Sequence, residues 1–150
     1  MSRFAVGTAF LLSAAFCLSM AGLPALASGE IVAGPVRADV ERVIDGDTFV
    51  VVAHVWPGHS VRVAVRIRGI DAPEMKSRCR AERQAAEAAR LALEELVGGE
   101  PVLLANIGGG KYYGRVVADV VTRDGRAAAD ALIAAHHARP YSGGRRGAYC

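Results

Sequence analysis

Apolar and polar residues alternate along several short stretches of the chain, which is the pattern of strands that bury one face. The alternation is clearest from Val61 to Ile67, where Arg66 lies on the face opposite the valines. β-branched residues dominate the run 48–53, and a turn-forming Trp-Pro-Gly-His-Ser sequence at 56–60 separates these two runs. Five strands are predicted in all, over residues 36–44, 48–53, 61–67, 101–107 and 116–121.

Two longer stretches have the spacing of amphipathic helices. The first is Arg80–Val97, which Gly98 and Gly99 end, and the second is Ala127–Ala138. The residues predicted to face the core are Ala81, Ala85, Ala89, Ala92, Leu93 and Leu96 in the first helix, and Ala131, Leu132 and Ala135 in the second. Three strands, a helix, two strands and a helix predict an α+β fold, a five-stranded Greek-key barrel of the OB-fold type.

The first 27 residues have the pattern of a signal peptide. Arg3 precedes an apolar run that ends in Pro24 and an Ala-Leu-Ala sequence, so we expect cleavage after Ala27 and export to the periplasm or the medium. The alternative is an uncleaved membrane anchor, since the run approaches the length of a membrane span. The rest divides into a flexible lead-in at 28–35, a domain at 36–141, and a Gly/Arg-rich tail at 142–150.

Charge and cysteine content add little to the functional assignment. The chain has 18 basic and 15 acidic residues, a balance that does not by itself indicate a nucleic-acid-binding protein. The tail arginines either contact a nucleic-acid backbone or are simply solvated. With Cys17 inside the predicted signal peptide, Cys79 and Cys150 remain as a pair, which favours a disulfide in an exported domain over two free thiols.

Acidic residues cluster at the ends of two predicted strands. Asp45 and Asp47 precede the strand 48–53, and Asp71 and Glu74 follow the strand 61–67. If these two strands pair through the turn between them, Asp47 lies near Asp71. Carboxylates brought together need a cation or a shared proton, and hard oxygen ligands suit Ca²⁺ or Mg²⁺.

Two arginines and a glutamate complete a possible phosphate-cleaving site. Arg66 and Arg115 are suited to holding a phosphate, because a guanidinium is always charged and donates in a planar fork. With a cation, they would offset the charge that develops during attack on a phosphodiester. Glu74 would accept a proton from the attacking water or orient it. Each residue alone also has a plain structural explanation, such as a turn or a solvated loop charge; the combination favours function.

The combination resembles the thermonuclease family, the staphylococcal-nuclease-like domains. The resemblance rests on Ile44-Asp45-Gly46-Asp47-Thr48, on the run from Val65 to Glu74 and on Tyr113-Gly114-Arg115, and it spans residues 36–141. It implies an OB-fold barrel and Ca²⁺-dependent hydrolysis of DNA and RNA that leaves 3′-phosphate ends. The alternative is a non-catalytic OB-fold module that binds nucleic acid or a protein.

The resemblance also implies roles for single residues. Asp47 and Asp71 would be metal carboxylates, and Ala72 would offer the metal its main-chain carbonyl. Arg66 and Arg115 would hold the phosphate, with Glu74 at the attacking water. Substrate contacts are expected from Lys111, Tyr113 and Tyr141.

The chain departs from the family pattern in three places. Lys111 lies one position before the usual lysine, and the base-stacking tyrosines are represented at best by Tyr141. A long third helix is missing, and a Cys79–Cys150 pair would tie down the short tail instead. We expect nucleic acid as the substrate, a monomer without a stable protein partner, and membrane contact only if the N-terminal segment stays attached.

Overall fold

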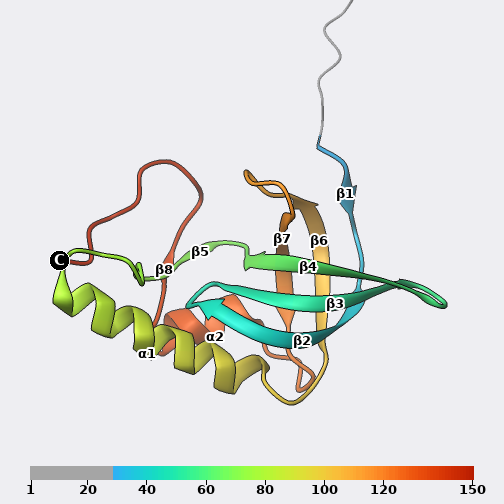
Figure 1. Ribbon diagram of the computed structural model, residues 1–150, viewed down its shortest axis with the longest axis horizontal. Helices are drawn as coiled ribbons and strands as arrows, with labels where there is room; N and C mark the ends of the chain where they lie inside the picture. The colour runs from blue at the N-terminus through green and yellow to red at the C-terminus, as the bar shows by residue number, and fades with distance from the viewer. Residues whose placement is uncertain (1–28) are drawn as a thin grey trace, which may run out of the picture.

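The computed structural model describes residues 29–150, so the predicted signal peptide at 1–27 lies outside the described residues. Five strands close into a barrel in the order β6-β2-β3-β4-β7, with β6 and β7 paired to complete the circle (Figure 1). All neighbours are antiparallel except β4 and β7. The strands are β2 (Val36–Asp45), β3 (Thr48–Trp56), β4 (His59–Ile67), β6 (Val102–Gly109) and β7 (Arg115–Val121). The predicted α+β barrel with two helices is confirmed.

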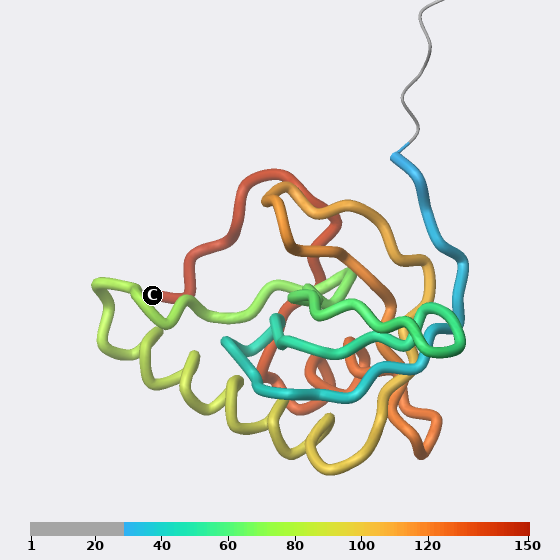
Figure 2. Tube along the Cα trace, turned by 45° about the vertical axis from the view of Figure 1, so that its right-hand side comes forward, coloured from blue at the N-terminus to red at the C-terminus, as the bar shows by residue number. Residues whose placement is uncertain are grey.

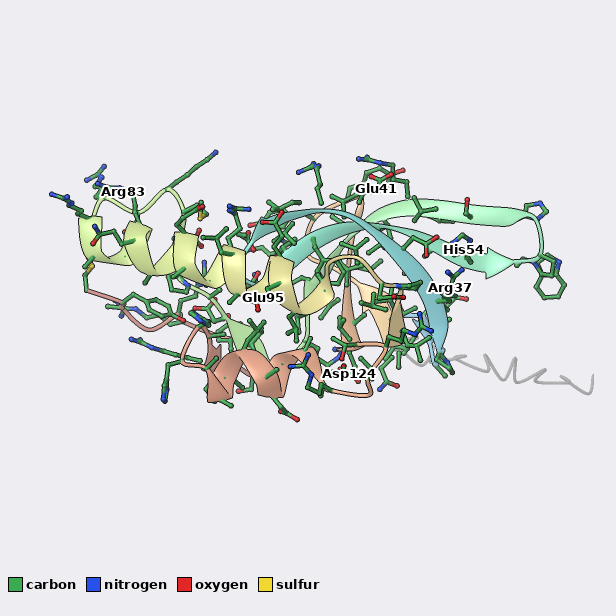
Figure 3. All side chains as sticks on the ribbon, turned by 90° about the horizontal axis from the view of Figure 1, so that it is seen from below. Arg37, Glu41, His54, Arg83, Glu95 and Asp124 are labelled. Atoms are coloured by element: carbon green, nitrogen blue, oxygen red, sulfur yellow. A yellow bond between two sulfur atoms is a disulfide. The ribbon has the colours of Figure 1, made fainter. Side chains whose placement is uncertain are left out.

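Two helices cover the barrel, and α1 (Arg80–Val97) has the bounds that the sequence predicts. Its buried residues are Ala86, Ala89, Leu93 and Val97. The predicted stripe was wrong at Ala81 and Ala85, which are exposed because the first turns of α1 extend beyond the barrel (Figure 1). Figure 3 shows α1 and α2 side by side, with the ion-pairing residues Arg37, Glu41 and His54 on the strands away from them.

The second helix is shorter than predicted. α2 covers Ala128–Ala134, with Ala128 and Leu132 buried and Ala135 exposed. His136 has a φ of 59°, the left-handed conformation, which ends the helix and turns the chain. The chain then forms β8 (Arg139–Pro140), which pairs with β5 (Ile70–Asp71) inside a stretch predicted as loop. A strand of two residues is too short to show an alternation of apolar and polar residues in the sequence.

Part of the predicted lead-in at 28–35 forms a short strand. Within it β1 (Ile31–Val32) pairs with the edge of β6, where Gly108 presents no side chain. The Asn106 amide donates a hydrogen bond to the carbonyl of Ala33 at 2.9 Å. In the part of the chain from 29 onward, no helix is long and apolar enough to cross a membrane.

The hairpin of β3 and β4 extends beyond the barrel (Figure 2). Trp56 lies exposed at its tip, and the connecting turn is only Pro57-Gly58, with Gly58 at a φ of 75°. The inner end of this hairpin packs into the core through Phe49, Val51, Val65 and Ile67. The functional candidates lie at that inner end.

Candidate functional site

The pairing of β3 with β4 brings Asp47 beside Arg66. Thr48 lies opposite Arg66 in the ladder, and the Ile67 amide donates to the carbonyl of Asp47 at 2.9 Å. The Arg66 Nη1 donates to Asp47 Oδ1 at 2.8 Å. The contact between Arg66 and Asp47 therefore follows from the strand register, whereas the sequence predicts only that Asp47 lies near Asp71.

Asp47 is almost completely buried, at 2% exposure. Its Oδ1 also accepts from the Thr48 hydroxyl at 2.7 Å, and its Oδ2 accepts from the Ala72 amide at 3.1 Å. Gly46 allows this position, because a Cβ there would lie 2.6 Å from the Cβ of Ala89 and 2.8 Å from that of Ala72. The tight packing against α1 fixes the Asp47 backbone.

The surroundings of Asp47 favour its protonated form. Burial is the largest cause, and the neighbouring charge of Asp45 adds to it, so that the pKa of Asp47 rises from 3.8 to about 6. Arg66, Thr48 and the Ala72 amide act in the opposite direction without reversing the change. Asp47 thus loses hydration on burial, and its contacts with Arg66, Thr48 and Ala72 make up for this loss only in part.

Asp71 reaches the same arginine from the other side. It is buried at the end of β5, and its Oδ1 accepts from Arg66 Nη2 at 3.3 Å. The same nitrogen donates to the carbonyl of Ile70 at 3.4 Å. The Arg66 side chain, 20% exposed, therefore joins the two carboxylates.

Glu74 lies at the outer edge of this group, with its side chain 56% exposed. Its amide donates to Glu82 Oε1 at 3.2 Å, and the Ser77 amide donates to its carbonyl at 3.2 Å. The Ser77 hydroxyl donates to the other oxygen of Glu82. The first turn of α1 thus holds the loop that presents Glu74.

Arg146 of the tail enters the site, which the sequence analysis did not predict. Its guanidinium pairs with Asp71 and Glu74, and its Nη2 donates to the carbonyl of Ala72 at 3.0 Å. The structure joins Cys79 to Cys150, with their Cα atoms 6.5 Å apart. The cysteine spacing was the signal for this position, since Cys79 lies only a few residues beyond Asp71 and Glu74.

Arg115 contacts Tyr112 and, among residues 29–150, makes no ion pair with Asp47, Asp71 or Glu74. Its guanidinium carbon lies 4.7 Å from the centroid of the Tyr112 ring, and Lys111 Nζ lies 5.7 Å from the same centroid. Within residues 29–150, the Arg115 Nε is buried without a hydrogen-bond partner, and Arg66 and Arg146 make the ion pairs of Asp47, Asp71 and Glu74. Tyr113 is fully exposed. The loop between β6 and β7 is therefore not joined to the acidic group.

Tyr141 lines a cavity of about 510 Å³ next to Arg66. Ile70 and Val117 form part of its wall, and the tail closes one side at Ser142 and Gly143. The Tyr141 hydroxyl donates to the carbonyl of Gly144 at 2.7 Å. Of the predicted substrate-binding residues, Tyr141 is the one whose ring shares a cavity with a site arginine.

Comparison with known proteins places part of the chain in a known family. A family model described as staphylococcal nuclease homologue matches residues 64–146, more than half of the chain. The matched region runs from β4 through the tail and contains Arg66, Asp71, Glu74, Arg115 and Arg146, whereas Asp47 precedes it. A search of curated proteins returned no match.

Proposed function

The chain belongs to the staphylococcal nuclease homologue family, and from this premise we propose that it is an exported nuclease. The proposed reaction is Ca²⁺-dependent hydrolysis of phosphodiester bonds in DNA or RNA that leaves 3′-phosphate ends. The observation that carries the proposal is the position of Arg66 between Asp47 and Asp71, with the Ala72 amide donating to Asp47. One arginine and two buried carboxylates in contact suit a site for a phosphate and a cation together.

The donor atoms fit a hard divalent cation. Asp47 and Asp71 offer carboxylate oxygens and Ala72 offers a carbonyl, which are the ligand types that Ca²⁺ takes. Among residues 29–150 there is no group of three or more His, Cys, Asp or Glu placed to hold a metal, so water would complete the coordination. A bound cation would also favour the ionised form of Asp47, whose pKa is raised mainly by burial.

The chain's own residues would divide the chemistry among them. Arg66 is positioned to hydrogen-bond the phosphate that a cation also contacts, and a bound Ca²⁺ would add positive charge beside the developing negative charge. Glu74 is the most exposed carboxylate of the group and would accept a proton from the attacking water or orient it. Arg115 would leave the Tyr112 ring to reach the phosphate, whose oxygens would give its Nε a partner.

The test compares cleavage of DNA and of RNA by purified protein in Ca²⁺ and after addition of a chelator. End-group analysis of the products identifies 3′-phosphates. Arg66→Lys keeps the charge but loses the two-pronged contact with Asp47 and Asp71, so we expect activity to fall by about 10²-fold or more. The matched control is Arg62→Lys, an exposed arginine of the same strand that pairs with Glu41.

Two results would contradict the proposal. Absence of cleavage in Ca²⁺, or cleavage that the chelator leaves unchanged, would exclude a Ca²⁺-dependent nuclease. If the protein then bound nucleic acid without cutting it, the barrel would be a binding module, as OB folds also are.

A further inference from the structure

The C-terminal tail, residues 141–150, folds back over the acidic site. It leaves β8 beside β5, where the Tyr141 amide donates to the carbonyl of Gly69 at 2.8 Å. Gly143 and Gly144 reverse its direction with φ values of 103° and 90°, a conformation that side chains disfavour. Figures 1 and 2 show the tail arching away from the barrel and returning to the first turn of α1. There the disulfide joins Cys150 to Cys79.

The returning part of the tail is held against Asp71. The Tyr149 hydroxyl donates to the main-chain carbonyl of Asp71, and the Arg139 guanidinium stacks 3.9 Å from the centroid of the Tyr149 ring. Arg139 also donates to the carbonyl of Ala148 at 2.8 Å. These contacts fix the residues that flank Arg146.

Arg146 contacts two groups that would bind the cation in the proposed function, Asp71 and the carbonyl of Ala72, and it also contacts Glu74. It pairs with the carboxylates of Asp71 and Glu74 and donates to the carbonyl of Ala72. Arg66, on β4, offsets the negative charges of Asp47 and Asp71. Arg146, in the tail, offsets those of Asp71 and Glu74. The guanidinium of Arg146 therefore contacts Asp71, Ala72 and Glu74 at the same time.

We propose that Arg146 is a tethered counter-ion that competes with the divalent cation for the oxygens of Asp71 and Ala72, and that the Cys79–Cys150 disulfide keeps it at the site. This inference rests on the proposed function, because the competitor of Arg146 is the proposed cation. The tail thereby sets the cation concentration at which the site becomes loaded. Loading requires Arg146 to leave these oxygens, which frees its guanidinium.

The tether makes the competition strong for a simple geometric reason. Arg146 and Cys150 are four positions apart in the sequence, so an extended chain keeps them within about 14 Å of each other. A group confined to that radius has an effective concentration on the order of millimolar or more. Without the disulfide only the connection to β8 remains, and Arg146 samples a much larger volume.

The experiment measures Ca²⁺ affinity by calorimetry, together with hydrogen exchange of the tail amides. The variants are Arg146→Gln, Cys79→Ser combined with Cys150→Ser, and the matched control Arg145→Gln. Arg145 is the adjacent, exposed tail arginine, and its replacement removes the same charge from the chain. Arg146→Gln keeps the disulfide, so it tests the proposal even if the double cysteine variant fails to fold.

We expect Arg146→Gln to bind Ca²⁺ about tenfold more tightly than the unchanged protein, within the usual range for coupled binding events. The double cysteine variant should shift in the same direction, and Arg145→Gln should bind within about twofold of the unchanged protein. Added Ca²⁺ should speed exchange of the amides at 142–149 in the unchanged protein. Equal or weaker affinity in Arg146→Gln, or a tail whose exchange does not respond to Ca²⁺, would overturn the proposal.

The same measurements separate this inference from the proposed function. If the protein cleaves DNA in Ca²⁺ and all variants bind Ca²⁺ equally, the competition fails and the nuclease assignment stands. If calorimetry detects no Ca²⁺ binding in any variant, both are wrong.

Discussion

Arg66 and Asp47 are 19 residues apart in the sequence and 2.8 Å apart at Nη1 and Oδ1, because β4 returns antiparallel to β3. The same side chain contacts Asp71, five residues farther along the chain. One arginine thus connects the start of β3 with the loop after β4. The barrel supplies this connection through register alone, and each site property below depends on it.

Removing the arginine should destabilise the metal-free protein. Arg66→Leu leaves the buried Asp47 without its arginine and Asp71 with Arg146 alone, and breaking a buried pair in this way typically costs about 3–5 kcal/mol. We expect a loss of about this size in the free energy of unfolding by urea, measured with a chelator near neutral pH. Arg62→Leu, which breaks an exposed pair with Glu41, should cost less than about 1 kcal/mol. If both variants lost a similar free energy of unfolding, the buried Arg66 contacts would stabilise the protein no more than an exposed ion pair does.

The raised pKa of Asp47 predicts how stability changes with pH. In the unfolded chain this carboxyl ionises near 3.8, and in the folded protein near 6, so ionisation at neutral pH favours the unfolded state. The loss of stability caused by ionised Asp47 is nearly absent at low pH, and it grows as the pH rises from about 4 through about 6. It then stays constant at roughly 3 kcal/mol, from 1.36 kcal/mol for each pH unit between the two values.

Asp47→Asn tests this, because an amide has nearly the same shape and does not titrate. In chelator, the free energy of unfolding of the variant relative to the unchanged protein should rise by about 2 kcal/mol between roughly pH 4 and pH 7.5. Other titrating groups are shared by both proteins and cancel in the difference. A difference that stays flat over this range would show that Asp47 is ionised normally.

Gly46 should tolerate no side chain. A Cβ there would lie 2.6 Å from Ala89 and 2.8 Å from Ala72, so α1 or the loop after β5 would have to move. We expect Gly46→Ala to lower the free energy of unfolding by about 1–3 kcal/mol and to weaken the contact of Asp47 with the Ala72 amide. Gly58→Ala is the comparison, since a Cβ at that exposed hairpin turn meets nothing within 4 Å and the cost there is backbone strain alone. Calorimetric unfolding and Ca²⁺ titration of both variants would distinguish the two effects.

The sequence predicts the elements whose signals are local. The bounds of α1 follow from its periodicity and from Gly98, and the barrel strands follow from alternation of β-branched residues. The approach of Asp47 to Asp71 follows once β3 and β4 pair through a short turn. These features need no knowledge of distant parts of the chain.

Features that depend on distant contacts were missed. β5 and β8 are two residues each and exist only because Asp71 and Arg139 meet across the fold. Arg146 looks like one basic residue among several in a Gly-rich tail, and its position results from the glycine reversal, the Tyr149 contact and the disulfide together. Arg115 is the reverse case: a motif predicts it at the site, while the structure stacks it on Tyr112.

Glu74 should separate cleavage from cation binding. It is the most exposed carboxylate of the site and pairs with Arg146 rather than with Arg66, so its replacement leaves the contacts of Asp47 and Asp71 with Arg66 intact. We expect Glu74→Gln to lower kcat by about 10²-fold or more, the usual contribution of a residue that handles a proton in the transition state. Ca²⁺ affinity should stay within about threefold or rise slightly, because the amide also weakens the hold of the tail on the site.

Kinetics in Ca²⁺ and calorimetry on the same preparation check both parts of this expectation. Glu95→Gln is the control, an exposed glutamate of α1 whose side chain Figure 3 shows away from the tail. A variant with weakened Ca²⁺ binding and an unchanged kcat at saturating Ca²⁺ would instead make Glu74 a cation ligand. A drop in kcat with unchanged affinity requires that the proton step, and not cation loading, depends on this carboxylate.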